Sequence, residues 1–263
     1  MGFSITAQRC LIVLSLIGAL LAGLPADAAQ KDQSVDVLWV KQQNAYLGAS
    51  DLYLGDERGR VVTRNGNIVI ICAPPHWDVL IFNKKDKLGL CLSSDEWQKS
   101  GLKAVESRVK LSTAKRSPTF DTALHLDCWE SIVPANVMVF TENDPLVFRG
   151  GREQKLSEIQ FRCTRGMRFS PHMTQFIIGL FNTKGITDLP LSLFNQWSDG
   201  TRSPLYKTLS VKKTKLPLSS FDYPTGYKKS KNIPQTLLGS TDMKTVTDFM
   251  NAIIDEDQQG KGK

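Results

Sequence analysis

Histidine, the side chain most often used for acid–base chemistry, is scarce in this sequence of 263 residues. Its three histidines, His76, His125 and His172, do not pair with one another or with a cysteine at a spacing that suits a metal ion. His125 and Asp127 would share one face of a strand, where a base and an orienting acid could meet. A solvated polar strand face explains the same two residues, and the sequence lacks the common nucleophile and phosphate-binding motifs. We therefore expect no catalytic residue, no metal site and no cofactor.

The N-terminus carries the three parts of an export signal in order. Arg9 supplies a positive charge, residues 11–24 form an apolar run, and Ala26-Asp27-Ala28 supplies small residues for cleavage. The apolar run is shorter than the ~18–20 residues that a stable membrane span needs. We predict a cleaved signal peptide over residues 1–28.

The chain that follows the signal is long enough for one domain with its own core. No linker or fixed repeat divides it, so we predict a single β-rich domain over residues 29–255 and a disordered polar tail over residues 256–263. The cleaved protein would be periplasmic or secreted. No later segment is apolar for long enough to make it an integral membrane protein.

Four cysteines follow the signal, namely Cys72, Cys91, Cys128 and Cys163. An even number of cysteines in an exported chain favours disulfides. Three pairings are possible, and we predict the nearest-neighbour one, Cys72 with Cys91 and Cys128 with Cys163. A metal site would need short C-x-x-C spacing, which is absent, and buried free thiols are the remaining alternative.

The chain is basic, with a formal net charge of +7. The candidates for an anionic-surface contact are Lys212, Lys213, Lys215, Lys228 and Lys229. Such clusters attract lipid headgroups or envelope polymers, although an ordinary solvated face has the same composition. Nucleic acid is not an expected partner, because no basic and aromatic stacking motif accompanies the lysines.

Between residues 46 and 93 the pattern is typical of an antiparallel meander. Asn65-Gly66 separates two β-prone runs and is a strong signal for a tight hairpin. Five short strands spaced about 10 residues apart are expected here.

The rest of the chain adds fewer elements. Ser94 is the expected cap of a short helix, and residues 176–181 suit either a strand or a buried helix. Strands are also predicted at residues 122–129, 136–140, 159–163 and 205–211. A helix is predicted from Ser240 or Thr241 to about Asp255.

Two phrases of the sequence resemble a known family. Residues 73–83 (Ala-Pro-Pro-His-Trp-Asp-Val-Leu-Ile-Phe-Asn), with a lysine-rich turn and Asp95-Glu96-Trp97 after them, resemble the opening meander of periplasmic lipoprotein-carrier-like (LolA-like) half-barrels. Residues 216–227, which end in Pro-Thr-Gly-Tyr, are similar to the closing strand of such chains. The resemblance implies an α+β fold in which a strongly curved, mainly antiparallel half-barrel carries a few helices and offers its concave face to acyl chains. It assigns no functional residue by position.

The leading hypothesis is an exported, non-catalytic protein that holds an apolar ligand or a lipid anchor, such as lipoprotein acyl chains, on the concave face of its sheet. The candidates for lining that face are Ile70, Val79, Ile81 and Leu90. The alternative is a closed core, with function in contacts to an envelope protein or an anionic surface. An exported enzyme of unrecognised type is the third hypothesis.

Overall fold

The computed structural model describes residues 33–44, 47–63, 65–102, 114–134, 148–149, 152–153, 156–183 and 185–239. The chain divides into two compact units, residues 1–35 with 215–220 and residues 36–214 with 221–263. In the first unit, the backbone N–H of Leu218 donates to the carbonyl of Gln33 at 2.7 Å. The predicted signal peptide, the helix expected after residue 239 and the polar tail lie outside the described residues.

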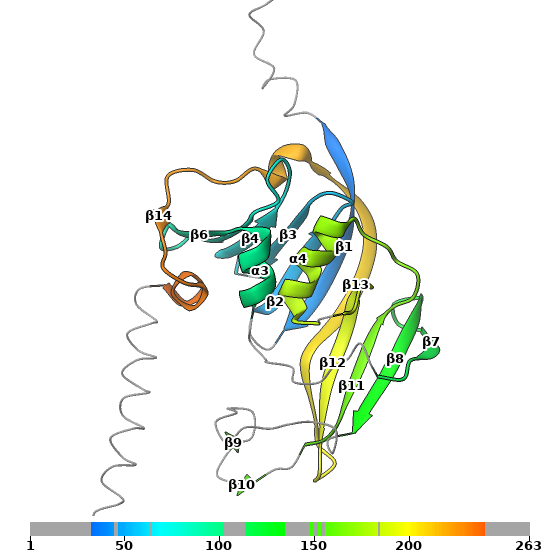
Figure 1. Ribbon diagram of the computed structural model, residues 1–263. Coiled ribbons are helices and arrows are strands. Elements are labelled where there is room, and N and C mark those ends of the chain that lie inside the picture. Colours follow the sequence, from blue (N-terminus) through cyan, green and yellow to red (C-terminus); the bar gives the residue numbers. More distant parts are fainter. Residues whose placement is uncertain are drawn as a thin grey trace, which may run out of the picture. The chain divides into compact units, whose positions relative to one another are not determined.

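Strands make up most of the described chain (Figure 1). They are β1 (Ser34–Asn44), β2 (Gly48–Leu54), β3 (Gly59–Thr63), β4 (Ile68–Cys72), β5 (Val79–Asn83), β6 (Leu88–Leu92), β7 (Ser117–Asp121), β8 (Leu126–Pro134), β9 (Phe148–Arg149), β10 (Arg152–Glu153), β11 (Leu156–Thr164), β12 (Pro190–Trp197), β13 (Arg202–Pro217) and β14 (Lys228–Lys229). The helices are α3 (Ser94–Ser100), α4 (Pro171–Phe181) and the short 3-10 helix η3 (Leu218–Phe221), and residues 233–239 are also helical.

The described strands form one sheet of 12 in the order β14-β6-β5-β4-β3-β2-β1-β13-β12-β11-β8-β7, with β9 and β10 paired separately. Where the register is defined, the pairs are antiparallel except for β14 with β6, which is parallel. The sheet ends in two edge strands, β14 and β7, and is not closed. The predicted α+β fold with a mainly antiparallel sheet is confirmed.

The cross-strand register from β2 to β6 assigns apolar side chains to one face, here called the inner face. One row across it is Leu54, Gly59, Cys72, Val79 and Leu92, and the next is Leu52, Val61, Ile70, Ile81 and Leu90. β4 is buried along its whole length, which agrees with its unbroken apolar sequence and means that both faces are covered there. The meander predicted from the sequence is confirmed strand by strand.

Helix α4 packs directly on the inner face. Ser170 accepts a hydrogen bond from the backbone of Met173, Pro171 follows the cap, and buried Met173, Phe176, Ile177 and Leu180 recur at helical spacing. Gly59 of β3 lets the helix come close, because a Cβ atom there would lie 2.5 Å from the Phe176 ring. The segment that the sequence left open between strand and helix is therefore a helix.

Helix α3 lies beside α4 (Figure 1). Ser93, not the predicted Ser94, caps it, in a capping box with Glu96. Trp97 is almost fully buried, and its indole N–H donates to the carbonyl of Phe176 at 3.1 Å. Gly179 of α4 leaves room for this indole, so the two helices touch through a glycine.

Residues 222–230, here called the outer strap, cross the opposite face of the sheet. The ring of Tyr227 lies on Gly89, where a Cβ atom would come within 2.1 Å of it. The hydroxyl of Tyr223 donates to the carbonyl of Asp78. The strap then pairs with the β6 edge through the backbone of Ser230, which donates to Gly89 at 2.8 Å.

The sheet differs from the sequence prediction in two respects. β1 and β12 were not predicted; β12 begins at Pro190, and proline is tolerated at the first residue of a strand. Residues 122–129 were predicted as one strand, but 122–125 form a turn that leads into β8. The strand predicted at residues 136–140 lies outside the described residues.

The close contact between α3 and α4 predicts that Gly179→Ala destabilises the protein. The new methyl group would lie 2.2 Å from Trp97 Nε1. We expect the free energy of unfolding to fall by about 1–3 kcal/mol, even though alanine favours helices by about 1 kcal/mol over glycine. Denaturant unfolding measures the change.

Gly55→Ala is the matched control. Its Cβ atom would have its nearest neighbours at 3.4–3.5 Å, an ordinary contact, and we expect a change within about 0.5 kcal/mol. A Gly179→Ala protein as stable as the parent would show that the helices do not pack in this way.

Candidate functional site

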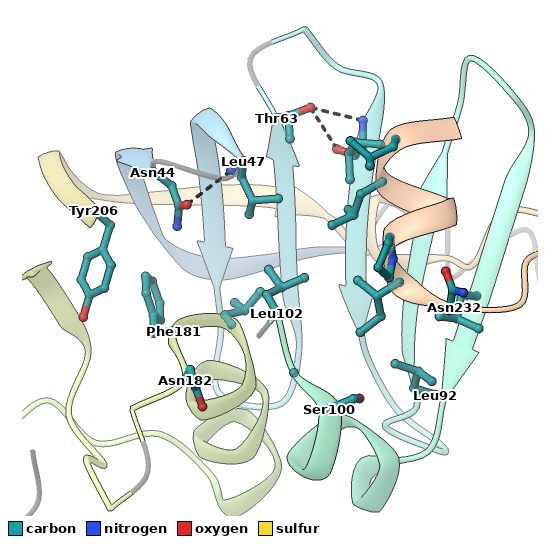
Figure 2. Close-up of a pocket in the computed structure, with 18 of the residues that line it drawn as sticks. Asn44, Leu47, Thr63, Leu92, Ser100, Leu102, Phe181, Asn182, Tyr206 and Asn232 are labelled. Atoms are coloured by element: carbon teal, nitrogen blue, oxygen red, sulfur yellow. Dashed lines mark hydrogen bonds between the residues drawn. The ribbon is translucent and has the colours of Figure 1, made fainter. Parts of the chain in front are cut away.

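A cavity of about 810 Å³ lies between the inner face of the sheet, the ends of α3 and α4, and residues 231–238 (Figure 2). Its volume falls within the range of about 300–1,000 Å³ that is usual for small-molecule sites. Its lining is mostly aliphatic and aromatic. The apolar lining residues are Leu47, Ile68, Leu90, Leu92, Leu102, Leu180, Phe181, Leu193, Leu205, Ile233, Pro234, Leu237 and Leu238.

The cavity exists because the helices do not reach across the whole inner face. Met173 and Phe176 cover the part of the sheet near Gly59. Ile68 and Leu90 lie farther along the inner face and line the cavity. Alternating strand geometry puts these apolar side chains on the face that the helices leave open.

Residues 233–239, here called the wall segment, form the side of the cavity nearest the β6 edge (Figure 2). Asn232 caps the segment by accepting a hydrogen bond from the backbone of Gln235 at 2.9 Å. The side chain of Asn83 in β5 donates to the carbonyl of Thr236 at 3.1 Å, and Thr236 is fully buried. This hydrogen bond joins the wall segment to the sheet, and Ile233 and Leu237 of the segment form part of the cavity lining.

Several polar side chains of the lining form hydrogen bonds to the backbone of hairpin turns. Figure 2 shows Thr63 beside β4, where its hydroxyl accepts from the backbone of Ile68 at 3.2 Å. Asn44 accepts from the backbone of Leu47 at 3.3 Å. These side chains hold the rims of hairpins together.

Two lining hydroxyls differ from the rest. Those of Thr183 and Tyr206 are buried and have no hydrogen-bond partner among the described residues. Burial raises the pKa of Tyr206 well above its ordinary value, so this phenol stays protonated. Its ring packs against Phe181 with centroids 5.0 Å apart. Unsatisfied hydroxyls of this kind are costly, and a ligand with a hydrogen-bonding atom would relieve them.

The four predicted lining residues separate into two groups. Leu90 lines the cavity. Ile70, Val79 and Ile81 are 0–1% exposed and belong to the core beneath α4. The sequence indicated the correct face, but not which part of that face the helices cover. It also missed the wall segment, for which Asn232 ahead of Pro234 is a helix-start signal.

The predicted lysine cluster does not form one patch along the sheet. Lys212 and Lys213 are neighbours in β13, so they point to opposite faces, and both are exposed. Lys228 and Lys229 are exposed in β14, and six strands separate β14 from β13 in the sheet order. Lys215 is exposed and belongs to the smaller unit.

The predicted disulfides are not formed, and all four cysteines are free thiols. Cys72 is in β4 and Cys91 in β6, with β5 between them, so their backbones are roughly 9–10 Å apart. Cys72 shares a row with Leu92, and therefore Cys91 points to the opposite face. A disulfide cannot join cysteines in that arrangement.

The second predicted pair is also offset. Cys128 lies opposite Thr164, and Cys163 lies opposite Trp129, so the two cysteines are one position out of register on adjacent strands. Successive residues of a strand point to opposite faces, which separates their sulfur atoms. Burial, with a smaller contribution from Asp188, raises the pKa of Cys163 to about 12. Close spacing along the sequence misled the pairing prediction.

His125 lies in the turn between β7 and β8, and Asp127 is the second residue of β8. His125 adopts a left-handed backbone with φ of 53°. Both side chains are exposed, in contrast to the enclosed base and acid of a catalytic pair.

Two further searches concern the described residues only. Among them, no group of three or more His, Cys, Asp or Glu side chains is placed to hold a metal ion. In the same part of the chain, no helix has both the length and the apolar character that crossing a membrane requires.

Comparisons with known proteins add little. No protein-family model matches the sequence, and no curated protein matches it. One solved structure that resembles the chain is that of an uncharacterized conserved protein from Thermus thermophilus, with 11% sequence identity and a TM-score of 0.37. The alignment covers 78% of this chain and 96% of that one. A TM-score this low carries no argument about fold or function.

The unpartnered hydroxyl at the cavity predicts an unusual effect of Tyr206→Phe. Since the hydroxyl is buried without a hydrogen bond, its removal should leave the ligand-free protein as stable or up to about 1 kcal/mol more stable. Tyr223→Phe is the control, because it removes the bond to Asp78 and should cost about 0.5–1.5 kcal/mol. Denaturant unfolding of both variants decides, and a clear loss of stability in Tyr206→Phe would mean that the hydroxyl has a partner.

The free thiols predict a selective labelling pattern. Burial and the nearby Asp78 raise the pKa of Cys91, but this thiol is exposed to the reagent. Burial raises the pKa of Cys72 to about 12, so the buried Cys72 has almost no thiolate near neutral pH. In a chain that begins at residue 29, a maleimide should label Cys91 first, and all four thiols should react after unfolding without reductant. Mass spectrometry counts the labels. Fewer than four labels on the unfolded chain would show that a disulfide is present and that the free-thiol assignment is wrong.

Proposed function

We propose that this protein is an exported, non-catalytic carrier that holds an apolar ligand or a lipid anchor in the cavity of its larger unit. In this proposal the open sheet is a curved half-barrel, and α3, α4 and the wall segment close its inner face around the ligand. The ligand's hydrocarbon part contacts the leucine-rich lining.

The cavity is the observation that carries the proposal. A space of about 810 Å³ bounded by Leu90, Leu193, Leu205 and Leu237 is large enough for a small-molecule ligand, and its walls are mainly apolar. A lining of this composition favours hydrocarbon over polar ligands. The cavity supports a carrier over a closed core whose function lies in surface contacts.

Two further observations support the carrier over an enzyme. The lining side chains include no histidine, cysteine, aspartate or glutamate among the described residues. Among the lining hydroxyls, that of Thr63 is used by a hairpin turn and that of Ser100 donates to the carbonyl of Glu96 at 2.6 Å, whereas those of Tyr206 and Thr183 are buried without a partner among the described residues. Such a lining can bind and orient a ligand, but its described residues lack the histidine and carboxylate groups that most often act as general bases.

Export and the family resemblance remain part of the proposal. The N-terminal charge, apolar run and small residues support a signal peptide. The resemblance to lipoprotein-carrier-like half-barrels supports acyl chains as the hydrocarbon part. The exposed lysines of β13 and β14 supply positive charge that favours approach to an anionic envelope surface.

Ligand binding should depend on Leu237. This residue is half-buried in the wall segment and lines the cavity, so Leu237→Asp would place a charge where hydrocarbon must pack. We expect a fluorescent fatty-acid analogue to bind the purified parent protein and to bind the variant about tenfold more weakly, since burying a charge in an apolar site is costly. Fluorescence titration measures the two dissociation constants.

Leu209→Asp is the matched control, because Leu209 is 55% exposed on β13 and does not line the cavity. Its affinity should equal that of the parent, and thermal unfolding should show that both variants fold. No binding of the analogue to the parent protein, after removal of any lipid that co-purifies, would refute the carrier function.

A further inference from the structure

The cavity has a buried end and a solvent-facing rim. Leu193, Leu205 and Tyr206 are 4–6% exposed and mark the buried end. The exposed lining residues are Asn65, Lys231, Asn232, Pro234 and Leu238. Most of these belong to the wall segment or the two residues before it, so a ligand meets solvent there.

Charge at this rim has one sign. Among the described lining residues, Lys231 is the charged one, and none is acidic. Its ammonium group forms no ion pair with a described acid. An unpaired lysine at the mouth of an apolar cavity is an arrangement that favours an anion there.

Two acidic residues on the neighbouring elements, Asp86 and Glu96, do not line the cavity. Asp86, in the turn before β6, lies against the backbone of Gly239 at the far end of the wall segment. Glu96 accepts hydrogen bonds from the backbone and hydroxyl of Ser93 at 2.8 and 2.9 Å. These bonds lower the pKa of Glu96, with smaller contributions from Lys229 and Lys99.

The backbone of Lys231 is held in place. Its N–H donates to the side-chain carbonyl of Gln235 at 2.9 Å, and the preceding Ser230 donates to Gly89 at 2.8 Å. The chain therefore leaves the β6 edge and begins the wall segment at a fixed point. This fixes the base of the Lys231 side chain beside the opening while the ammonium group stays in water.

We propose that the ligand is an anionic amphiphile whose hydrocarbon chain fills the cavity and whose carboxylate or phosphate pairs with Lys231 at the rim. This inference rests on the proposed carrier function and adds the class of ligand. An ionised headgroup cannot enter a leucine-lined cavity without losing its hydration, so it stays at the opening. There the ammonium group of Lys231 is the partner that the structure offers.

Competition with amphiphiles that share a twelve-carbon chain tests the headgroup. The fluorescent fatty-acid analogue is displaced from the delipidated protein by laurate, dodecyl phosphate, dodecanol or dodecylamine at pH 8. We expect both anions to bind about fivefold more tightly than dodecanol, and dodecylamine to bind most weakly. Raising the salt from about 20 mM to about 500 mM should reduce the preference for anions, because the rim is exposed. The ratio of the dissociation constants of laurate and dodecyl phosphate shows whether the site prefers a carboxylate or a phosphate.

Lys231→Ala should weaken the binding of laurate by about two- to fivefold and change the affinity for dodecanol by less than about twofold. Lys228→Ala is the control, since this exposed lysine of β14 is three residues away and does not line the cavity. Equal affinities for laurate and dodecanol, or an equal effect of Lys231→Ala on both, would overturn the inference and leave the carrier function standing. Failure of every twelve-carbon probe to bind would instead overturn the carrier function.

Discussion

The close approach of α4 to β3 at Gly59 determines how the rest of the larger unit is arranged. Because glycine has no side chain there, Met173 and Phe176 reach the sheet, and Trp97 can follow by packing on Gly179. The helix pair therefore covers one end of the inner face very tightly. The same tightness stops it from spreading over Ile68 and Leu90, which are left to line a cavity. A larger residue at Gly59 would lift the helix, and the division between packed core and cavity would be lost.

Alternation in the sequence was enough to predict the meander from β2 to β6, because each strand carries its own period-two or fully apolar signal and each turn has its own polar or glycine-containing residues. The α4 helix was within reach as well, since Ser170-Pro171 is a helix start and Met173, Phe176, Ile177 and Leu180 share one face. The prediction began at Phe176 and so missed the cap. β1 and β12 had local signals that the prediction did not use. β1 contains the β-prone run Val37-Leu38-Trp39-Val40, and in β12 Leu191 and Leu193 alternate with Ser192.

The site was harder to predict than the fold. Ile70, Val79, Ile81 and Leu90 look alike in sequence, and only the position of the helices decides that Leu90 lines the cavity while the other three are core. The cysteine pairing failed for a related reason. Pairing by sequence distance ignored the register, which puts Cys72 and Cys91 on opposite faces. Both errors arise because spacing along the sequence reveals neither where the helices lie on the sheet nor the register between strands.

The outer strap and the wall segment have a consequence for the order in which the molecule becomes functional. The chain reaches the wall segment only after it has crossed the outer face at Tyr227 and turned around the β6 edge at Ser230. During synthesis, which runs from the N-terminus, the sheet strands and both packed helices emerge before this wall exists. A nascent chain therefore exposes the apolar residues that later line the cavity, such as Leu90, Leu193 and Leu205. The side chain of Asn83 can donate to the carbonyl of Thr236 only when that residue, about 150 positions later, has emerged. The wall segment therefore closes the cavity after the sheet strands from β1 to β13 have emerged, and the exposed apolar surface needs protection from aggregation until then.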